Sequence, residues 1–245
     1  MSLLEGEIHI CLLHLAPFND KAVNRCLYLL DDEERNRTGR IRHWETRRNF
    51  VLVRSVLRLL LGRWLSCEPN SIRFMLGVKG KPRLEGTEPD QGLVFNVSHS
   101  GDFGLIALAC DTAIGVDVER WRTMSNQDDI AKRCFSPDEL AHWDRLPPEN
   151  QQETFYARWS FKEAFVKATG EGIALGLDSC VIDLSAHSPC MTSIPDRYGT
   201  PDAWRLKEIN VEHGYSAAIC YFGSTRKLLN IDTGELVNNL FNHVI

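Results

Sequence analysis

The order of predicted elements repeats along this chain, and that repeat limits the folds it can adopt. A strand pattern over Ile8–Leu15 precedes a helix pattern over Trp44–Leu65, a glycine turn and two further strands. A strand pattern over Ile114–Glu119 precedes a second helix pattern over Glu153–Thr169, after which glycines and strands follow again. Because each half mixes helices and strands, we predict an α+β fold. Two similar halves predict a pseudo-dimer with a cleft between them, a favoured place for ligands.

The closing strand pairs of the two halves also resemble each other. The first has the sequence FNVSHSGDFGLIALA (Phe95–Ala109) and the second INVEHGYSAAICYF (Ile209–Phe222). We divide the chain into an N-terminal half, residues 1–113, and a C-terminal half, residues 114–245. Within the second half, Ser136-Pro137-Asp138-Glu139 is a capping box that predicts a helix start. The remaining strands are expected at Val181–Leu184, Ala203–Val211 and Ser216–Phe222.

Composition excludes several classes of protein. The chain has 245 residues, of which 43% are hydrophobic and 25% charged, as in ordinary globular proteins. Its apolar runs fall far short of the roughly 18 residues of a membrane span. Met1–Ile10 lacks a basic, apolar leader, so we expect a cytoplasmic protein. The eight cysteines are at least ten positions apart, which favours reduced thiols over zinc or disulfide sites. Motifs of the forms HExxH, GxxxxGKS and GxSxG do not occur.

Positive charge is concentrated in one predicted helical region. The chain carries a net charge of −5, yet Glu33–Arg63 holds nine arginines against three glutamates. Arg47, Arg54 and Arg58 fall on one helix face, where like charges repel one another. Either an anionic ligand or a buried carboxylate would relieve that repulsion, and the sequence leaves both open.

Acidic and basic groups recur at spacings that suit phosphate chemistry. In the strand Ile114–Glu119, Asp117 and Glu119 share one face about 6.5 Å apart, so both can reach one hard cation or simply face solvent. Glu163 and Lys167 are neighbours on a helix and can act together or form a surface ion pair. Ser98 and His99 end a strand beside a glycine, and Lys81 lies in a rigid turn. These last groups suit a phosphate but are unspecific alone.

Five segments together resemble a known family, the 4'-phosphopantetheinyl transferases of the surfactin-synthetase-activating type, its larger two-half class. The segments are GKPRL (Gly80–Leu84), FNVSHSGD (Phe95–Asp102), IGVDVE (Ile114–Glu119), AKRCFSPDE (Ala131–Glu139) and WSFKEAFVKATGEGI (Trp159–Ile173). They occur in the family's order. The resemblance implies the family's fold, a pseudo-dimer of two similar α/β halves with the active site in the cleft.

The resemblance also implies an activity. The family moves the 4'-phosphopantetheine group from coenzyme A to a serine hydroxyl of an acyl or peptidyl carrier protein, with Mg²⁺ as cofactor and release of adenosine 3',5'-bisphosphate. Matched positions make Glu163 and Lys167 catalytic, Glu163 as proton acceptor and Lys167 as stabiliser of the departing phosphate. The implied Mg²⁺ ligands are Asp117, Glu119 and Glu163. The implied coenzyme A contacts are Lys81, Ser98, His99, Lys162, Arg47 and Arg54.

Partners follow from the same resemblance. We expect the carrier protein, which is acidic, to dock near the basic cluster formed by Arg120, Arg122, Lys132 and Arg133, with Trp121 and Met124 as apolar contacts. We expect a monomer that binds neither nucleic acid nor membrane.

Two other functions fit the sequence less well. A coenzyme A-binding regulatory protein without turnover would lack one of Asp117, Glu119, Glu163 and Lys167, and all four are present. A Mg²⁺-dependent phosphatase or nuclease is disfavoured by the acidic total charge and by the scarcity of aromatic residues among the arginines.

Overall fold

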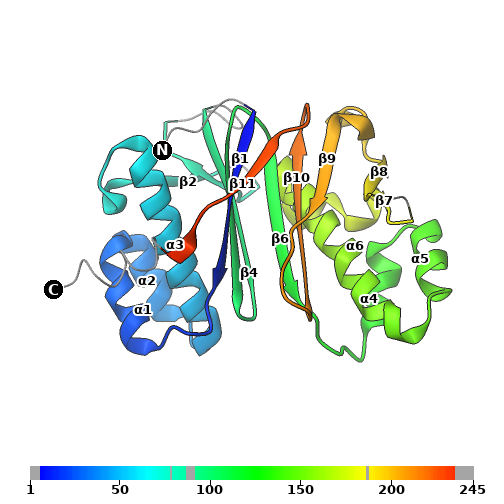
Figure 1. Cartoon of the computed structure of the whole chain (residues 1–245), viewed down its shortest axis with the longest axis horizontal. Coiled ribbons are helices and arrows are strands. Elements are labelled where there is room, and N and C mark those ends of the chain that lie inside the picture. The colour runs from blue at the N-terminus through cyan, green and yellow to red at the C-terminus, as the bar shows by residue number, and fades with distance from the viewer. Residues whose placement is uncertain (1–5, 78, 87–91, 186–187, 235–245) are drawn as a thin grey trace.

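The computed structural model describes residues 6–77, 79–86, 92–185 and 188–234 (Figure 1). The parts of the predicted halves at 1–5 and 235–245 lie outside the described residues. The first half contains β1 (Glu7–His14), α1 (Asp20–Cys26), α2 (Asp32–Arg40), α3 (Trp44–Leu65), β2 (Phe74–Leu76), β3 (Pro82–Leu84), β4 (Leu93–Ser100) and β5 (Phe103–Cys110). The second contains β6 (Ile114–Arg120), α4 (Gln127–Cys134), α5 (Pro137–Asp144), α6 (Pro148–Thr169), β7 (Val181–Asp183), β8 (Cys190–Ser193), β9 (Trp204–Glu208), β10 (Tyr215–Phe222) and β11 (Lys227–Asn230).

The topology of the two main sheets confirms the predicted duplication. One sheet has the strand order β11-β1-β5-β4 and the other β6-β10-β9. β1 pairs antiparallel with β5, as β6 does with β10, and β5 pairs antiparallel with β4, as β10 does with β9. Each half therefore repeats the same three-stranded unit, in keeping with the α+β pseudo-dimer.

The halves are arranged as layers that bury apolar faces against one another. In Figure 1, α1, α2 and α3 cover the outer side of the first sheet, and α4, α5 and α6 cover the outer side of the second. Alternating apolar side chains of both sheets meet in a shared central core. It is formed by Ile8, Ile10, Phe103, Leu105, Ala107, Ala109, Ile114, Val116, Val118, Ala217, Ile219 and Tyr221.

The last strand crosses from the C-terminal half to the first sheet. β11 pairs in parallel with β1, from Glu7 opposite Lys227 to Ile10 opposite Asn230. The chain thus ties its final described strand to its first one. The boundary after residue 113 stays a prediction.

The long helices begin and end at residues with clear local roles. α3 has the predicted bounds and ends at Ser66, whose φ is 53°. α6 begins at Pro148, five residues before the predicted start, because proline suits the first helical position. It ends at Gly170 with φ 75°, a left-handed conformation that glycine adopts freely. The capping box of Ser136 and Glu139 at α5 is confirmed.

Some expectations differ from the structure. The strand predicted over Ala203–Val211 ends at Glu208. α1 and β8 were not predicted, because each is short and has a weak periodic pattern. Within the described ranges, no helix is both long enough and apolar enough to cross a membrane.

Candidate active site

Part of the predicted site gathers where β4 meets β6 at the boundary between the halves, namely Ser98, Asp117, Glu119 and Lys167. These two strands belong to different sheets, so side chains rather than a backbone ladder connect them. Ser98 Oγ donates to Asp117 Oδ1 at 3.0 Å, and Ser100 Oγ donates to Glu119 Oε2 at 2.8 Å. The period of two places the hydroxyls of β4 and the carboxylates of β6 on facing sides. We call this contact the β4–β6 seam.

Asp117 is the central acid of the seam. Its side chain is only 3% exposed, and Lys167 Nζ lies 2.6 Å from its Oδ1 atom. The same ammonium donates to Ser98 Oγ at 3.0 Å. The other carboxylate oxygen, Oδ2, is buried and has no hydrogen-bond partner among the described residues. A buried acceptor without a partner is costly, so Oδ2 is a position where a cation would be stabilised.

Gly115 brings α6 directly against β6. A Cβ atom there would lie 2.1 Å from Ala164 O and 2.3 Å from Ala168 N, distances that no side chain tolerates. Glycine is therefore required for the close contact between strand and helix. That contact places Lys167, one turn after Glu163, over Asp117 of the strand.

The surroundings of the other two carboxyl groups, Glu119 and Glu163, raise their pKa values. Burial, and next the charge of Asp117, raise the pKa of Glu119 to about 7, while its hydrogen bond from Ser100 acts in the opposite direction. Burial and then Asp117 also raise the pKa of Glu163, and Lys167 partly offsets them. Acidic groups that repel one another in this way would be stabilised in their ionised form by a bound cation.

The seam fits a magnesium ion held partly by substrate. Among the described residues, no group of three or more His, Cys, Asp or Glu side chains is close enough to hold a metal ion as it stands. Mg²⁺, however, commonly takes one or two carboxylates and completes its shell with water and phosphate oxygens. Asp117 Oδ2 and Glu119 have the chemistry of that minimal set, and the assignment of Asp117, Glu119 and Glu163 as ligands stays a prediction.

His99 lies in positively charged surroundings. Burial is the main cause that lowers its pKa, and the charges of Lys167, Arg37 and Arg54 lower it further. The imidazole is therefore favoured in its neutral form and can donate a hydrogen bond to an anion. Positive groups from both halves therefore make the surroundings of His99 suited to a phosphate.

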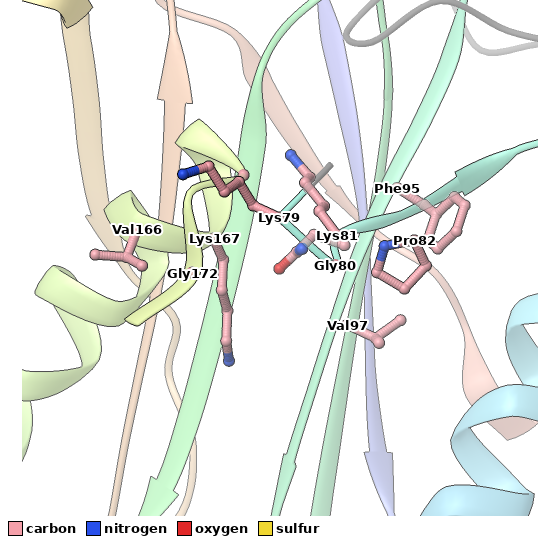
Figure 2. A pocket seen from close by; sticks show the side chains of 11 residues that line it. Lys79, Gly80, Lys81, Pro82, Phe95, Val97, Val166, Lys167 and Gly172 are labelled. Atoms are coloured by element: carbon pink, nitrogen blue, oxygen red, sulfur yellow. The ribbon is translucent and has the colours of Figure 1, made fainter. Parts of the chain in front are cut away.

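Lys81 connects the two halves at one end of the seam. Its Nζ donates to Ile114 O at 3.1 Å and to Ala168 O at 3.0 Å, the second of these near the C-terminal end of α6. A cavity of about 230 Å³ opens here. Figure 2 shows Lys81 on the side of this cavity that the N-terminal half forms. Lys167 extends from α6, with its ammonium directed away from Lys81. The cavity is lined by Lys79, Gly80, Lys81, Pro82, Phe95, Asn96, Val97, Val166, Lys167, Gly170 and Gly172.

The predicted arginines of α3 bind protein groups. Arg54 Nε lies 3.1 Å from Glu34 Oε1, and its guanidinium is 4.8 Å from the ring centroid of Phe74. Arg47 Nη2 donates to Asn24 at 2.8 Å, on the side of α1. Of the two explanations for the lined-up arginines, a buried carboxylate is the one observed for Arg54. Arg47 lies away from the seam.

Lys162 requires a correction. Its side chain is fully buried, and Nζ lies 2.7 Å from Glu139 Oε2 while donating to the carbonyls of Leu177 and Cys180. It therefore points from α6 toward α5 and the residues after α6, not toward the seam. A contact with coenzyme A is not compatible with this burial, so Lys162 is a structural residue.

Sequence reasoning missed several groups of the seam. Ser100 contacts Glu119, and Asn96 contacts the backbone of β6. Their positions two residues before and after Ser98 were the available signal, because alternate residues of a strand share a face. A second cavity, of about 470 Å³, opens beside Glu119. It is lined by Ser100, Glu119, Arg120, Arg122, Met124, Ile130, Phe155, Tyr156 and Trp159.

Comparisons with known proteins place the chain among group-transferring enzymes. A family model described as the 4'-phosphopantetheinyl transferase superfamily matches residues 113–220. A second, described as 4'-phosphopantetheinyl transferase, N-terminal, matches residues 17–111. The 4'-phosphopantetheinyl transferase HetI of Nostoc is 34% identical to this chain, with 91% of each chain covered. The 4'-phosphopantetheinyl transferase Sfp of Bacillus subtilis is 30% identical over 83% of this chain and 87% of its own.

This chain belongs to the 4'-phosphopantetheinyl transferase superfamily, as the resemblance of its motifs predicted. Enzymes of this class transfer the phosphopantetheine group to carrier proteins. Among solved structures, a holo-(acyl-carrier-protein) synthase from Bacillus anthracis matches 46% of this chain and 98% of its own, with 16% identity and a TM-score of 0.38. That likeness is too low to carry an argument about the site.

Proposed function

We propose that this chain transfers 4'-phosphopantetheine from coenzyme A to a serine hydroxyl of an acyl or peptidyl carrier protein, with Mg²⁺ as cofactor. The observation that carries the proposal is the contact of Asp117 with Lys167 and Ser98 across the β4–β6 seam. The serine oxygen forms a bond to the phosphorus that carries the pantetheine arm, and the bond to the second phosphate breaks. Adenosine 3',5'-bisphosphate leaves, so the phosphorus ends with four oxygen neighbours again.

The acidic side chains would have two roles, metal binding and proton transfer. Asp117 and Glu119 would hold Mg²⁺, which when bound neutralises charge on the diphosphate. Glu163, as a third ligand or through a water, would accept the serine proton. Its raised pKa supports this role, because a carboxylate with a pKa nearer neutrality is a stronger base.

The basic side chains would bind the phosphates. Lys167 would stabilise the departing phosphate, and Ser98 and His99 would donate hydrogen bonds to diphosphate oxygens. Lys81, which is half-buried, would contact coenzyme A where it lines the 230 Å³ cavity, while its ammonium donates to carbonyls of β6 and α6. Arg54 Nη1 is buried without a hydrogen-bond partner among the described residues, so it could donate to a phosphate of coenzyme A, whereas Arg47 would first have to release Asn24.

The carrier protein would dock beside the 470 Å³ cavity. Arg120, Arg122 and Met124 line this cavity next to Glu119. Lys132 and Arg133 are exposed on α4. Trp121 is anchored by a hydrogen bond from Nε1 to Ser216 Oγ at 2.9 Å. Positive groups around an apolar hollow suit an acidic partner that must bring its serine close to the carboxylates.

The test of the proposal is intact mass spectrometry of apo carrier proteins incubated with this chain, coenzyme A and Mg²⁺. We expect a mass gain of one phosphopantetheine arm that EDTA abolishes. Glu163→Gln should lose the gain while coenzyme A still binds, and Glu149→Gln, an exposed glutamate on the same helix, should keep it. Absence of any gain from the unchanged chain despite coenzyme A binding would contradict the proposal, and full turnover by Glu163→Gln would remove the base assigned here.

A further inference from the structure

The side chains of β4 replace a missing neighbour of β6. β6 is an outer strand of its sheet, so within the described part of the chain its outward N–H groups have no strand to pair with. Asn96 Oδ1 accepts the N–H of Val116 at 2.8 Å, and Ser100 Oγ accepts the N–H of Arg120 at 3.1 Å. The N-terminal half therefore fixes the backbone of β6 at two points, one on each side of Asp117.

Ser100 makes a second bond that the backbone contact alone does not require. Its hydroxyl donates to Glu119 Oε2 at 2.8 Å. A serine hydroxyl has a single hydrogen, and with the oxygen already accepting from Arg120 N–H, that hydrogen is directed at the carboxylate. Ser100 is 8% exposed, so water offers little competition for these bonds. The orientation of Glu119 is thus set by a residue of the other half.

We propose that Ser100 is a positioning residue that orients Glu119 for metal binding without touching metal or substrate. The inference rests on the proposed Mg²⁺ site. By engaging Oε2, Ser100 leaves Oε1 as the oxygen available to a cation. Groups that hydrogen-bond a metal ligand typically change metal affinity about 10-fold to 100-fold when removed. Ser98 differs, because its hydroxyl contacts Asp117 and Lys167.

The decisive experiment measures metal binding without turnover. Mn²⁺ is titrated into the full chain with saturating coenzyme A but no carrier, and free Mn²⁺ is followed by electron paramagnetic resonance against a blank of coenzyme A alone. Ser100→Ala should weaken Mn²⁺ binding about 10-fold. It should also raise the Mg²⁺ concentration for half-maximal activity, with the KM for coenzyme A at saturating Mg²⁺ unchanged. Ser100→Thr, which keeps the hydroxyl, should restore binding.

A matched control separates positioning from general damage. Ser55 is a buried serine of α3 whose hydroxyl donates to Cys26 O at 3.2 Å. Ser55→Ala removes the same group at a site without a carboxylate and should leave Mn²⁺ binding unchanged. If Ser100→Ala does not fold, Ser100→Cys keeps the volume with a much weaker donor, and the same loss of affinity is expected.

The outcomes distinguish the inference from the function on which it rests. Equal Mn²⁺ affinity in the unchanged chain and in Ser100→Ala would overturn the positioning role and leave the proposed Mg²⁺ site intact. An equal loss in Ser55→Ala would also overturn it. No Mn²⁺ binding by the unchanged chain would remove the metal site itself, and the positioning role with it.

Discussion

Asp117 shows how the neighbours of one residue set the chemistry of the site. It is buried, yet Lys167 and Ser98 contact one of its oxygens. An uncompensated buried carboxylate costs several kcal/mol, and the ammonium of Lys167, 2.6 Å from Oδ1, supplies the compensating charge. Burial, and next the charge of Asp117, raise the pKa values of Glu119 and Glu163. The negative charge of Asp117 therefore makes ionisation of Glu119 and Glu163 less favourable, and a bound cation would relieve this repulsion.

The raised pKa of Glu119, about 7 against an ordinary 4.5, predicts a pH dependence of stability without metal. Between these values the folded chain binds more protons than the unfolded chain, so the free energy of unfolding falls as pH rises. Urea unfolding in EDTA from pH 5 to 8 should show this fall, and Glu119→Gln should reduce it. An identical pH profile in the variant would contradict the prediction. Added Mg²⁺ should stabilise most at the upper end, where Glu119 is ionised.

How well a site residue could be predicted depended on whether its partners were local. Asp117 and Glu119 lie on one face because side chains alternate along a strand, so their proximity could be predicted from the sequence. The contacts of Lys162 and Arg54 could not be predicted, because a basic residue in a sequence does not reveal which distant acid it binds. Glu139 lies 23 positions before Lys162 and Glu34 20 positions before Arg54, and only the fold brings these pairs together.

At the scale of elements, the contact between β6 and α6 depends on Gly115. We expect Gly115→Ala to destabilise the chain by about 1–3 kcal/mol or more, because the added methyl group overlaps backbone atoms that cannot move independently. Urea unfolding measures this loss. Gly39→Ala in α2 is the control, since a Cβ there meets no atom within 4 Å and alanine favours a helix. Equal stability of the two variants would show that β6 and α6 can move apart at little cost in free energy.

The pair of Lys162 and Glu139 joins α6 to α5. Removing one member of a buried ion pair leaves an uncompensated charge and typically costs about 3–5 kcal/mol. Lys162→Met should therefore lower the free energy of unfolding strongly, whereas Lys132→Met on the exposed face of α4 should not. The KM for coenzyme A should stay unchanged in both. A raised KM with unchanged stability would return Lys162 to a role in coenzyme A binding.

Predictability also differed among elements. α3 has the predicted bounds because its apolar stripe is long and regular, and the capping box located the start of α5. β11 could not be foreseen, since four residues with little alternation become a strand only by pairing with β1. Long-range pairing decides such short strands, and a single sequence gives no measure of it.

At the scale of the whole molecule, each half presents an apolar sheet face that only the other half covers. The central core takes residues from both sheets, among them Leu105 of the first and Ile219 of the second. The β4–β6 seam lies along the same boundary, so the site requires both halves. Because both halves belong to one chain, the phosphate-binding and acidic groups keep their relative position at any protein concentration. Separate copies would assemble the same site only at concentrations above their dissociation constant.

This dependence predicts how the separated halves behave. Residues 1–113 and 114–245, produced as two chains, should each lack cooperative unfolding, because the exposed sheet faces remain uncovered. Mixed together, they should regain a cooperative transition and transfer phosphopantetheine to an apo carrier, measured by intact mass. A second fragment shortened to 114–223 lacks β11 and its parallel pairing with Glu7–Ile10, so it should associate more weakly. Cooperative unfolding of either half alone would show that the central core is not needed for its stability. Equally strong association of the shortened fragment would show that β11 does not help to hold the halves together.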